Sequence, residues 1–207
     1  AAGSSLENME NIKVYPSGGR LSDGRDVFVR YYSATPHGAM IVNAEGARFM
    51  KEYPASWVEV KAELDKQINS RMYLIFDEVT LQSMLAEHHT AGGFVMGWGK
   101  EQMENAFRDG LITRKGNTIE ELAKETGINP SRLLETVKQY NKHVEIGVDT
   151  DFGRDLTRPI DTKPFYAVEV GPLMMFTLGG LRISPDAKVL GNNGLPIVGL
   201  YAAGEVA

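Results

Sequence analysis

The chain has 207 residues, 43% of them hydrophobic and 24% charged, and its formal net charge at pH 7 is −5. These values are ordinary for a soluble globular protein, and the acidic balance argues against nucleic-acid binding, which usually needs a basic surface. The sequence has no cysteine, which excludes disulfides, thiolate metal sites and cysteine nucleophiles, and no apolar run approaches the roughly 20 residues that span a bilayer.

The first 49 residues are predicted to form one short helix followed by strands. Leu6, Met9 and Ile12 share a helical face, and the stretch 15–19, with its proline and paired glycines, is predicted to end that helix in a turn. Residues 27–49 favour strands around a loop, because apolar β-forming residues are bounded there by glycine and asparagine.

Longer helices follow, predicted from apolar residues at helical spacing and from capping residues. Asp77 can cap one helix, Thr118 opens another with a capping box, Asn129 and Pro130 open the last, and Gly147 closes it. These helices are expected over roughly 56–70, 77–87, 118–126 and 130–146, with a shorter one near 100–108. Residues 72–76 read as a continuous apolar strand and residues 111–113 as a short one.

Two patterns suggest a metal ion without the spacing that a site needs. His88 and His89 are adjacent, so their side chains point in different directions, and no carboxylate lies at a ligand spacing from them. The acidic stretch 147–154 lacks the glycine and the glutamate that an EF-hand loop has at its sixth and twelfth positions. No metal site is therefore predicted.

The C-terminal part contains the most distinctive pattern. Residues 174–184 favour a strand that is interrupted by Gly179 and Gly180, and paired glycines in a strand mark a bulge or a place where a ligand approaches the backbone. Residues 192–194, Asn-Asn-Gly, predict a tight turn, and the strand after it ends in Ala-Gly-Glu at 203–205.

These motifs resemble those of the fumarate reductase/succinate dehydrogenase flavoprotein family. The family has a T-x-G-G strand, here residues 177–180, followed by G-L-(Y/F)-A-A-G-E, here residues 199–205. Its G-A-I-L-V-N-x-x-G-x-R-F motif matches residues 38–49, and its capping-domain helices resemble residues 118–141. The resemblance implies an α+β fold, a flavoprotein capping domain with flanking strands of a truncated FAD-binding domain.

The same resemblance implies a domain division. Residues 1–26 would be a remnant of the FAD-binding domain with a linker, residues 27–163 the capping (substrate-lid) domain, and residues 164–207 returning strands of the FAD-binding domain. The family's glycine-rich βαβ unit, which binds the FAD pyrophosphate, has no counterpart in the sequence. We therefore expect a fragment whose partner is the missing FAD-binding half of the parent chain, and which is inactive and without FAD by itself.

The family's ligand-binding residues carry over to the C-terminal motifs. The resemblance implies cofactor contacts by Ala203, Gly204 and Glu205. It implies substrate contacts by Met175, Thr177, Gly179 and Gly180, with Met175 standing where the family has a histidine.

The family's catalytic charges are replaced in this sequence. The family's substrate threonine and proton-relay glutamate and arginine align with Tyr31, Tyr32 and Thr35, and its proton-donating arginine aligns with Ser56, while Glu52 is kept. A dicarboxylate needs fixed cations, usually arginines, so fumarate is not the expected substrate. Tyr31, Tyr32 and Glu52 are the predicted catalytic residues, with tyrosine as an acid or oxyanion donor.

Two functions from different classes remain open at this stage. The first is part of an FAD-dependent oxidoreductase that acts on a C–C bond, as a dehydrogenase or reductase, in a small-molecule substrate. The second is a non-catalytic ligand- or partner-binding module that uses the capping-domain fold, with the loop around Phe94–Trp98 as its contact. Buried packing of that loop is the ordinary alternative, and the composition does not distinguish a cytoplasmic protein from an exported one.

Overall fold

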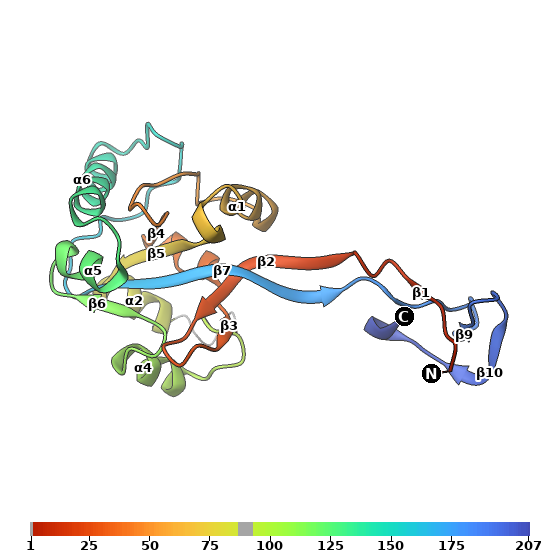
Figure 1. The fold of residues 1–207 in the computed structure, drawn as a ribbon. Helices are drawn as coiled ribbons and strands as arrows, with labels where there is room; N and C mark the ends of the chain where they lie inside the picture. Colours follow the sequence, from red (N-terminus) through yellow and green to blue (C-terminus); the bar gives the residue numbers. More distant parts are fainter. Residues whose placement is uncertain (1, 87–92) are drawn as a thin grey trace. The chain divides into compact units, whose positions relative to one another are not determined.

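The structure is a computed structural model that describes residues 2–86 and 93–207 (Figure 1). The histidine pair considered above as a metal site, His88–His89, lies outside the described residues. The chain divides into two compact units, a larger one of residues 16–173 and a smaller one that joins the residues before 16 to residues 174–207. Both boundaries fall inside long strands, β2 (Ile12–Arg20) and β7 (Phe165–Thr177).

A six-stranded sheet forms the centre of the larger unit. Its strand order is β3 (Asp26–Phe28), β2, β7, β5 (Met72–Asp77) and β4 (Met40–Val42), and β6 (Arg114–Gly116) also pairs with β7. β5 runs antiparallel to β7, with Met72 opposite Val170 and Asp77 opposite Phe165. β5 is apolar over five consecutive residues because both of its faces are covered.

The alternation of side chains along β5 and β7 divides the interior into two cores. Met72, Leu74 and Phe76 pack into one core together with helices α1 (Trp57–Leu64), α2 (Glu78–Ala86) and α4 (Lys100–Arg108). Ile75 and Ala167 point the other way, into the core under α5 (Ile119–Thr126) and α6 (Pro130–Ile146). Figure 1 shows α5 and α6 on the side of the sheet away from α2 and α4.

The capping residues place the helix ends near their predicted positions. The Asn129 side chain accepts a hydrogen bond from the Arg132 N–H at 3.0 Å, and Gly147 ends α6 with φ of 74°. At α5 the predicted capping box is half formed, because Glu121 accepts from the N–H of Asn117 and not from that of Thr118. None of the helices within the described ranges is long and apolar enough to cross a membrane.

Three predicted elements differ from the structure. The helix expected around residues 6–12 is wrong: this stretch contains β1 (Leu6–Glu7) and the start of β2, with Asn8 between them at φ of 55°. An isolated helix of two turns is marginal in water, so pairing with other strands decides the conformation. The helix expected over 56–70 ends at Leu64, and the strand expected at 111–113 is found three residues later as β6.

The turn predicted at residues 15–19 is also wrong, because these residues lie inside β2. Gly18 and Gly19 are buried there, and a Cβ atom on Gly18 would lie 2.9 Å from the carbonyl oxygen of Pro172. The paired glycines therefore allow β2 to pack closely against its neighbours, and they do not reverse the chain.

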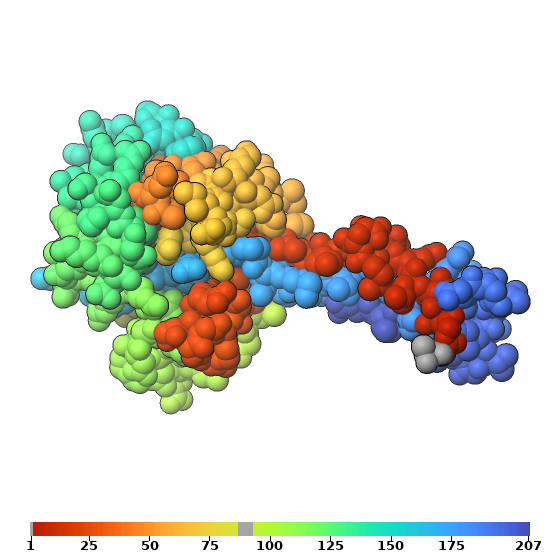
Figure 2. All heavy atoms as spheres, viewed as in Figure 1, coloured from red at the N-terminus to blue at the C-terminus, as the bar shows by residue number. Residues whose placement is uncertain are grey.

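The turn that follows β2 lies on the surface of the larger unit. Residues 21–25 connect β2 to β3, and the Ser22 N–H donates to the carbonyl oxygen of Leu111 at 2.7 Å. Figure 2 shows this turn beside the segment that contains α4. The hydrogen bond thus ties the β2–β3 hairpin to the end of that helical segment.

The smaller unit consists of two short antiparallel pairs. β1 pairs with β8 (Gly180–Leu181), and β9 (Lys188–Leu190) pairs with β10 (Pro196–Tyr201). The predicted Asn-Asn-Gly turn at 192–194 is confirmed as the hairpin connection, with Gly194 at φ of 76°. The described chain ends in a single 3-10 turn, Gly204–Val206.

We expect Gly46→Ala to destabilise the protein more than Gly147→Ala. Both glycines have a positive φ, 85° and 74°, but only Gly46 is crowded. A Cβ atom there would lie 2.8 Å from Ile128 Cγ2 and 3.1 Å from the Leu133 backbone nitrogen, whereas Gly147 faces open space. Gly147→Ala should cost about 1 kcal/mol through backbone strain, and Gly46→Ala about 1–3 kcal/mol more through overpacking. Urea unfolding measures both, and equal losses would contradict the packing argument.

Candidate functional site

The two predicted catalytic tyrosines lie on one 3-10 turn, Tyr31–Ser33, in the larger unit. Tyr31 is 2% exposed and Tyr32 is 49% exposed, and their rings meet edge to face with centroids 5.6 Å apart. Burial, and to a smaller extent the neighbouring Tyr32, raise the pKa of the Tyr31 hydroxyl well above its usual value. Tyr31 therefore stays protonated and supports the turn, while Tyr32 presents its ring to solvent.

Glu52, the third predicted catalytic residue, is buried and bonded to two arginines. Its Oε1 accepts from Arg48 Nε at 2.9 Å and lies 3.0 Å from Arg154 Nη1, and its Oε2 accepts from Arg48 Nη2 at 2.7 Å. The whole residue is 2% exposed. Through these contacts Glu52 links Arg48 to Arg154 inside the larger unit. Its part in catalysis stays a prediction.

Glu52 belongs to a buried ion network formed by Arg48, Glu52, Asp149 and Arg154. Arg48 donates to both oxygens of Asp149, at 3.1 and 2.8 Å, and the Arg154 N–H donates to Asp149 Oδ2 at 3.0 Å. The network holds two positive and two negative groups, so the charges balance. Each of the four side chains is at most 4% exposed, so water does not screen their attraction.

Neighbouring groups hold the network in its charged form. Burial by itself would raise the pKa of Asp149, but hydrogen bonds from Arg48 and from the Arg154 N–H outweigh it and hold this pKa well below its usual value. Burial would likewise lower the pKa of Arg48, and bonding to Asp149 and Glu52 raises it instead. Asp149 and Arg48 are therefore fixed charges over the physiological range and do not exchange protons.

Aromatic rings complete the surroundings of this network. The Tyr140 ring lies 5.6 Å from the Arg48 guanidinium and 5.1 Å from that of Arg154, and the Phe152 ring lies 5.1 Å from Arg48. A cavity of about 520 Å³ opens beside these groups, bordered by Arg48, Tyr140, Phe152 and residues of α6. The polar side chains that line it already have partners within the protein, such as Glu52 and Asp149 for Arg48 and Asp151 for Gln139, so they are less available to a ligand.

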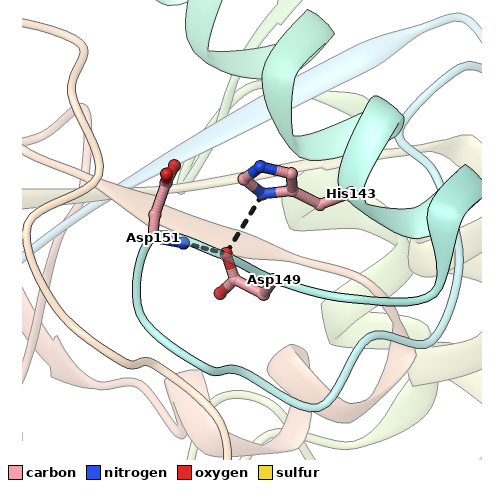
Figure 3. Close-up of side chains that lie close together, drawn as sticks. All are labelled: His143, Asp149 and Asp151. Atoms are coloured by element: carbon pink, nitrogen blue, oxygen red, sulfur yellow. Dashed lines mark hydrogen bonds and ion pairs between the residues drawn. The ribbon is translucent and has the colours of Figure 1, made fainter.

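One cluster beside the network has the residue types of a metal site (Figure 3). His143 Nδ1 lies 3.1 Å from Asp149 Oδ1, its Nε2 lies 3.1 Å from Thr150 Oγ1, and Asp151 accepts from Gln139 at 2.9 Å. Both oxygens of Asp149 already accept from Arg48. A divalent cation would therefore have to lie against a guanidinium, and the cluster is better explained as an extension of the ion network.

The predicted ligand residues of the smaller unit come together through two motifs. The Thr177 N–H donates to Glu205 Oε1 at 3.3 Å, although the two residues lie 28 positions apart. Met175 is half-buried, Thr177 is exposed, and Ala203, Gly204 and Glu205 form an exposed turn. The structure thus brings the T-x-G-G and A-G-E motifs into contact, and their roles toward a ligand stay predictions.

Gly179 and Gly180 are needed for contacts within the chain itself. A Cβ atom on Gly179 would lie 2.6 Å from the Met9 backbone nitrogen, and one on Gly180 would lie 2.6 Å from the Val206 carbonyl carbon. The close approach predicted at these glycines is therefore made by the chain's own backbone. Their contact with substrate stays a prediction.

Ser56, at the position of the family's proton-donating arginine, is the N-cap of α1. Its Oγ accepts from the Glu59 N–H at 3.3 Å and donates to Glu59 Oε2 at 2.9 Å, which also accepts from the Ser56 N–H. This capping box occupies the hydroxyl. Ser56 therefore begins a helix and has no hydrogen to spare for a ligand.

The loop considered as a partner contact has its large side chains mostly buried in the described part, residues 93–99. Phe94 and Val95 are 3% and 0% exposed and belong to the larger core, Trp98 is half-buried against it, and Met96, at 47%, is exposed together with two glycines. The observation favours buried packing and removes the main support for a non-catalytic binding module.

Sequence reasoning missed two features of the larger unit. The first is the ion network, because its partners lie about a hundred positions apart in the chain and no local spacing connects Arg48 to Asp149. The second is Arg30, which directly precedes the tyrosine pair and whose Nε is buried without a hydrogen-bond partner. The sequence signal for it was a single arginine that follows the strand residues Val27–Val29.

Comparison with known proteins relates the whole chain to flavoproteins. The sequence matches the FAD binding domain family over residues 1–207. It is 33% identical to a probable fumarate reductase of Shewanella frigidimarina, over 99% of this chain and 31% of that protein, and 32% identical to the urocanate reductase of Eggerthella lenta, over 99% and 32%. The open form of a flavocytochrome c3 fumarate reductase superposes with a TM-score of 0.77 at 31% identity, covering 99% of this chain and 32% of that one. The chain thus spans about a third of these relatives.

We expect Asp149→Asn to destabilise the protein at pH 7. We also expect the free energy of unfolding of the variant to fall less than that of the wild type when the pH is lowered. The folded pKa of Asp149 is lowered, so its contribution is fully present above the unfolded value of about 3.9 and is lost as the pH falls through the folded value. Breaking one partner of a buried ion pair costs about 3–5 kcal/mol.

Urea unfolding of the wild type and the variant between pH 7 and pH 2 measures both effects. Asp151→Asn, two residues away and exposed, is the control and should change stability by less than about 0.5 kcal/mol. If both variants lost the same stability, Asp149 would not be the centre of the network.

Proposed function

Because the chain belongs to the FAD binding domain family over its full 207 residues, we propose that it is part of an FAD-dependent oxidoreductase that acts on a C–C bond of a small molecule other than fumarate. The substrates for which its relatives are named support the reaction class, because fumarate and urocanate both contain a C=C bond that a reductase saturates. Bound FAD would supply the hydride chemistry, and the protein would bind and orient the substrate and exclude water.

The observation that carries the choice against fumarate is the capping box of Ser56. At the position where the resemblance implies a proton-donating arginine, the side chain is neutral and its hydroxyl is bonded to Glu59. Met175 adds a half-buried thioether where the resemblance implies a histidine. Neither side chain offers a cation to a carboxylate, so a dicarboxylate would lose two of its expected partners.

The exposed turn at 203–205 fits contact with a flavin. Gly204 has a φ of 82° and no atom within 4 Å of the position where a Cβ would lie, which leaves its backbone open to a ligand. Glu205 already holds the Thr177 N–H, so the T-x-G-G strand and this turn would be positioned together. Ala203, Gly204 and Glu205 are therefore the proposed cofactor contacts, with Met175, Thr177, Gly179 and Gly180 on the substrate side.

The larger unit is the proposed capping domain. The division of the chain near residues 15 and 173 supports two domains, and both boundaries lie about ten residues from those drawn at 26 and 163. Capping domains close over a bound substrate and keep water out of the reaction.

Tyr32 is the proposed proton donor. Its hydroxyl is on the exposed member of the tyrosine pair, and the buried Tyr31 holds its ring from the side. General acids of this kind contribute about 100-fold or more to turnover.

We expect Tyr32→Phe to lower kcat of the FAD-loaded enzyme about 100-fold on its C=C substrate and to leave its folding unchanged. Tyr73→Phe is the control, because Tyr73 is a half-buried residue of β5 that packs beside the α5–α6 core. Steady-state assays with a reduced dye measure both variants. Retention of full activity in Tyr32→Phe would assign the proton to another group.

The FAD-loaded protein should show no reduction of fumarate above background, because Ser56 and Met175 replace the charged groups that the resemblance implies. The same dye-coupled assay, with fumarate beside uncharged and monocarboxylate C=C compounds, tests this expectation. Fumarate turnover at a rate on the order of 10 per second would contradict it.

The 207-residue polypeptide by itself is expected to hold no FAD. Its sequence contains no strand followed by a glycine-rich phosphate-binding turn, and ordering the exposed residues 203–205 would cost roughly 1–2 kcal/mol per residue. Fluorescence quenching with FAD should detect no binding tighter than about millimolar. A yellow preparation would contradict this expectation.

A further inference from the structure

Arg30 differs from every other arginine of this chain. All eleven arginines lie in the residues that the structure describes. Ten of them make at least one side-chain hydrogen bond or ion pair with a described residue, and these are Arg20, Arg25, Arg48, Arg71, Arg108, Arg114, Arg132, Arg154, Arg158 and Arg182. For Arg30, the described part of the chain provides neither.

The backbone holds Arg30 firmly in place. Its N–H donates to the carbonyl oxygen of Phe94 at 2.7 Å, and its own carbonyl accepts from Ser33 Oγ at 2.7 Å. Val29, directly before it, is fully buried in the larger core. Arg30 therefore occupies a fixed position at the end of the strand segment, immediately before the tyrosine pair.

Its side chain is half-buried, and its Nε is buried without a hydrogen-bond partner among the described residues. The Nε of Arg154 shares this property, but Glu52 and the Thr35 carbonyl hold the rest of that guanidinium. A guanidinium stays charged at all working pH values, so this nitrogen has lost water without gaining an acceptor. Buried polar groups are almost always satisfied, and a buried charge without a partner is costly. A bound anion would accept the unused hydrogen bond of this guanidinium and offset the cost of burying it.

We propose that Arg30 binds the anionic group of a ligand, a carboxylate or a phosphate. The planar fork of the guanidinium matches two oxygens of either group. The proposal rests on the proposed function only for the source of the anion, which is the carboxylate of an unsaturated substrate or the phosphate of FAD.

A substrate bound in this way would be a monocarboxylate. Arg30 is the one described arginine whose guanidinium makes neither a hydrogen bond nor an ion pair with a described residue, and one fork holds one carboxylate. Tyr32, two residues along, offers an exposed ring to the remaining, planar or apolar, part of the molecule.

The first test measures anion binding without any turnover. The melting temperature of the protein is followed with sodium benzoate and with sodium phosphate, each against sodium chloride at the same ionic strength. The wild type should gain about 2–4 °C at a tenfold excess of anion over its Kd. Arg30→Met should lose this gain and, without anion, should melt at or above the wild-type temperature.

Arg25→Met is the matched control. Arg25 is exposed and paired with Asp23 at 2.7 Å, so its removal should leave the anion-dependent gain intact. Arg30→Lys keeps the charge without the fork and should retain only part of the gain, and it replaces Arg30→Met if that variant does not fold. The same gain in the wild type and in the Arg30 variants, or no gain in the wild type, would overturn the proposal.

The second test identifies the source of the anion and uses the parent protein with and without FAD, because the 207-residue polypeptide by itself is expected to hold none. If the substrate carboxylate binds Arg30, benzoate still raises the melting temperature when FAD is bound, and Arg30→Met raises KM for a monocarboxylate substrate about tenfold with a smaller change in kcat. If the FAD phosphate binds Arg30, FAD abolishes the benzoate effect, and Arg30→Met weakens FAD binding about tenfold. Absence of C=C turnover together with an intact anion effect would reject the proposed function and keep the anion site.

Discussion

The larger unit depends on one interaction, the buried ion network of Arg48, Glu52, Asp149 and Arg154. These residues come from two loops that lie about a hundred positions apart, and the network is what joins them. Arg154 also donates to the carbonyl oxygen of Thr35 at 2.7 Å, which fixes the segment after the tyrosine pair. Because the charges balance and the side chains exclude water, removing any one member leaves a buried charge without its partner.

The sheet supplies the frame on which this network is placed. Alternation along β5 and β7 sends neighbouring side chains into different cores, so the two helix layers are fixed to the same strands. β4 carries the chain from the tyrosine segment through a buried strand toward Arg48. The C-cap of α6 is Gly147, two residues before Asp149, so the end of this helix fixes the position of the Asp149 carboxylate. The positions of the charges thus follow from strand pairing and from helix ends.

Local signals in the sequence were enough for most of the elements. Asn129 with Pro130, and Asn192–Gly194, act through the conformation of a few neighbouring residues, and the helix and the hairpin that they predict are present. The N-terminal helix was mispredicted because strand pairing decides that stretch, and pairing partners cannot be read from a local period. The two tyrosines were found through the family motif with which they align, whereas Asp149 as a partner of Arg48 was not found, because no local spacing connects residues so far apart. Gly179 and Gly180 were correctly predicted as a site of close approach, but the approaching group is the chain's own backbone; Gly18 and Gly19 were mispredicted as a turn, and they too lie where the chain packs closely against itself.

The distribution of positive charge limits what this unit can recognise. Arg48 and Arg154 have their acceptors inside the protein, and Ser56 uses its hydroxyl for the helix that it begins. Among the described arginines, Arg30 is the one whose side chain makes no hydrogen bond or ion pair with a described residue; the Nε of Arg154 is also buried without a partner, but other nitrogens of that guanidinium are held by Glu52 and Thr35. A ligand with two carboxylates would need a second cation beside Arg30, because a second charge without a partner is costly to desolvate. A ligand with one anionic group and an apolar remainder matches both the single guanidinium and the exposed ring of Tyr32.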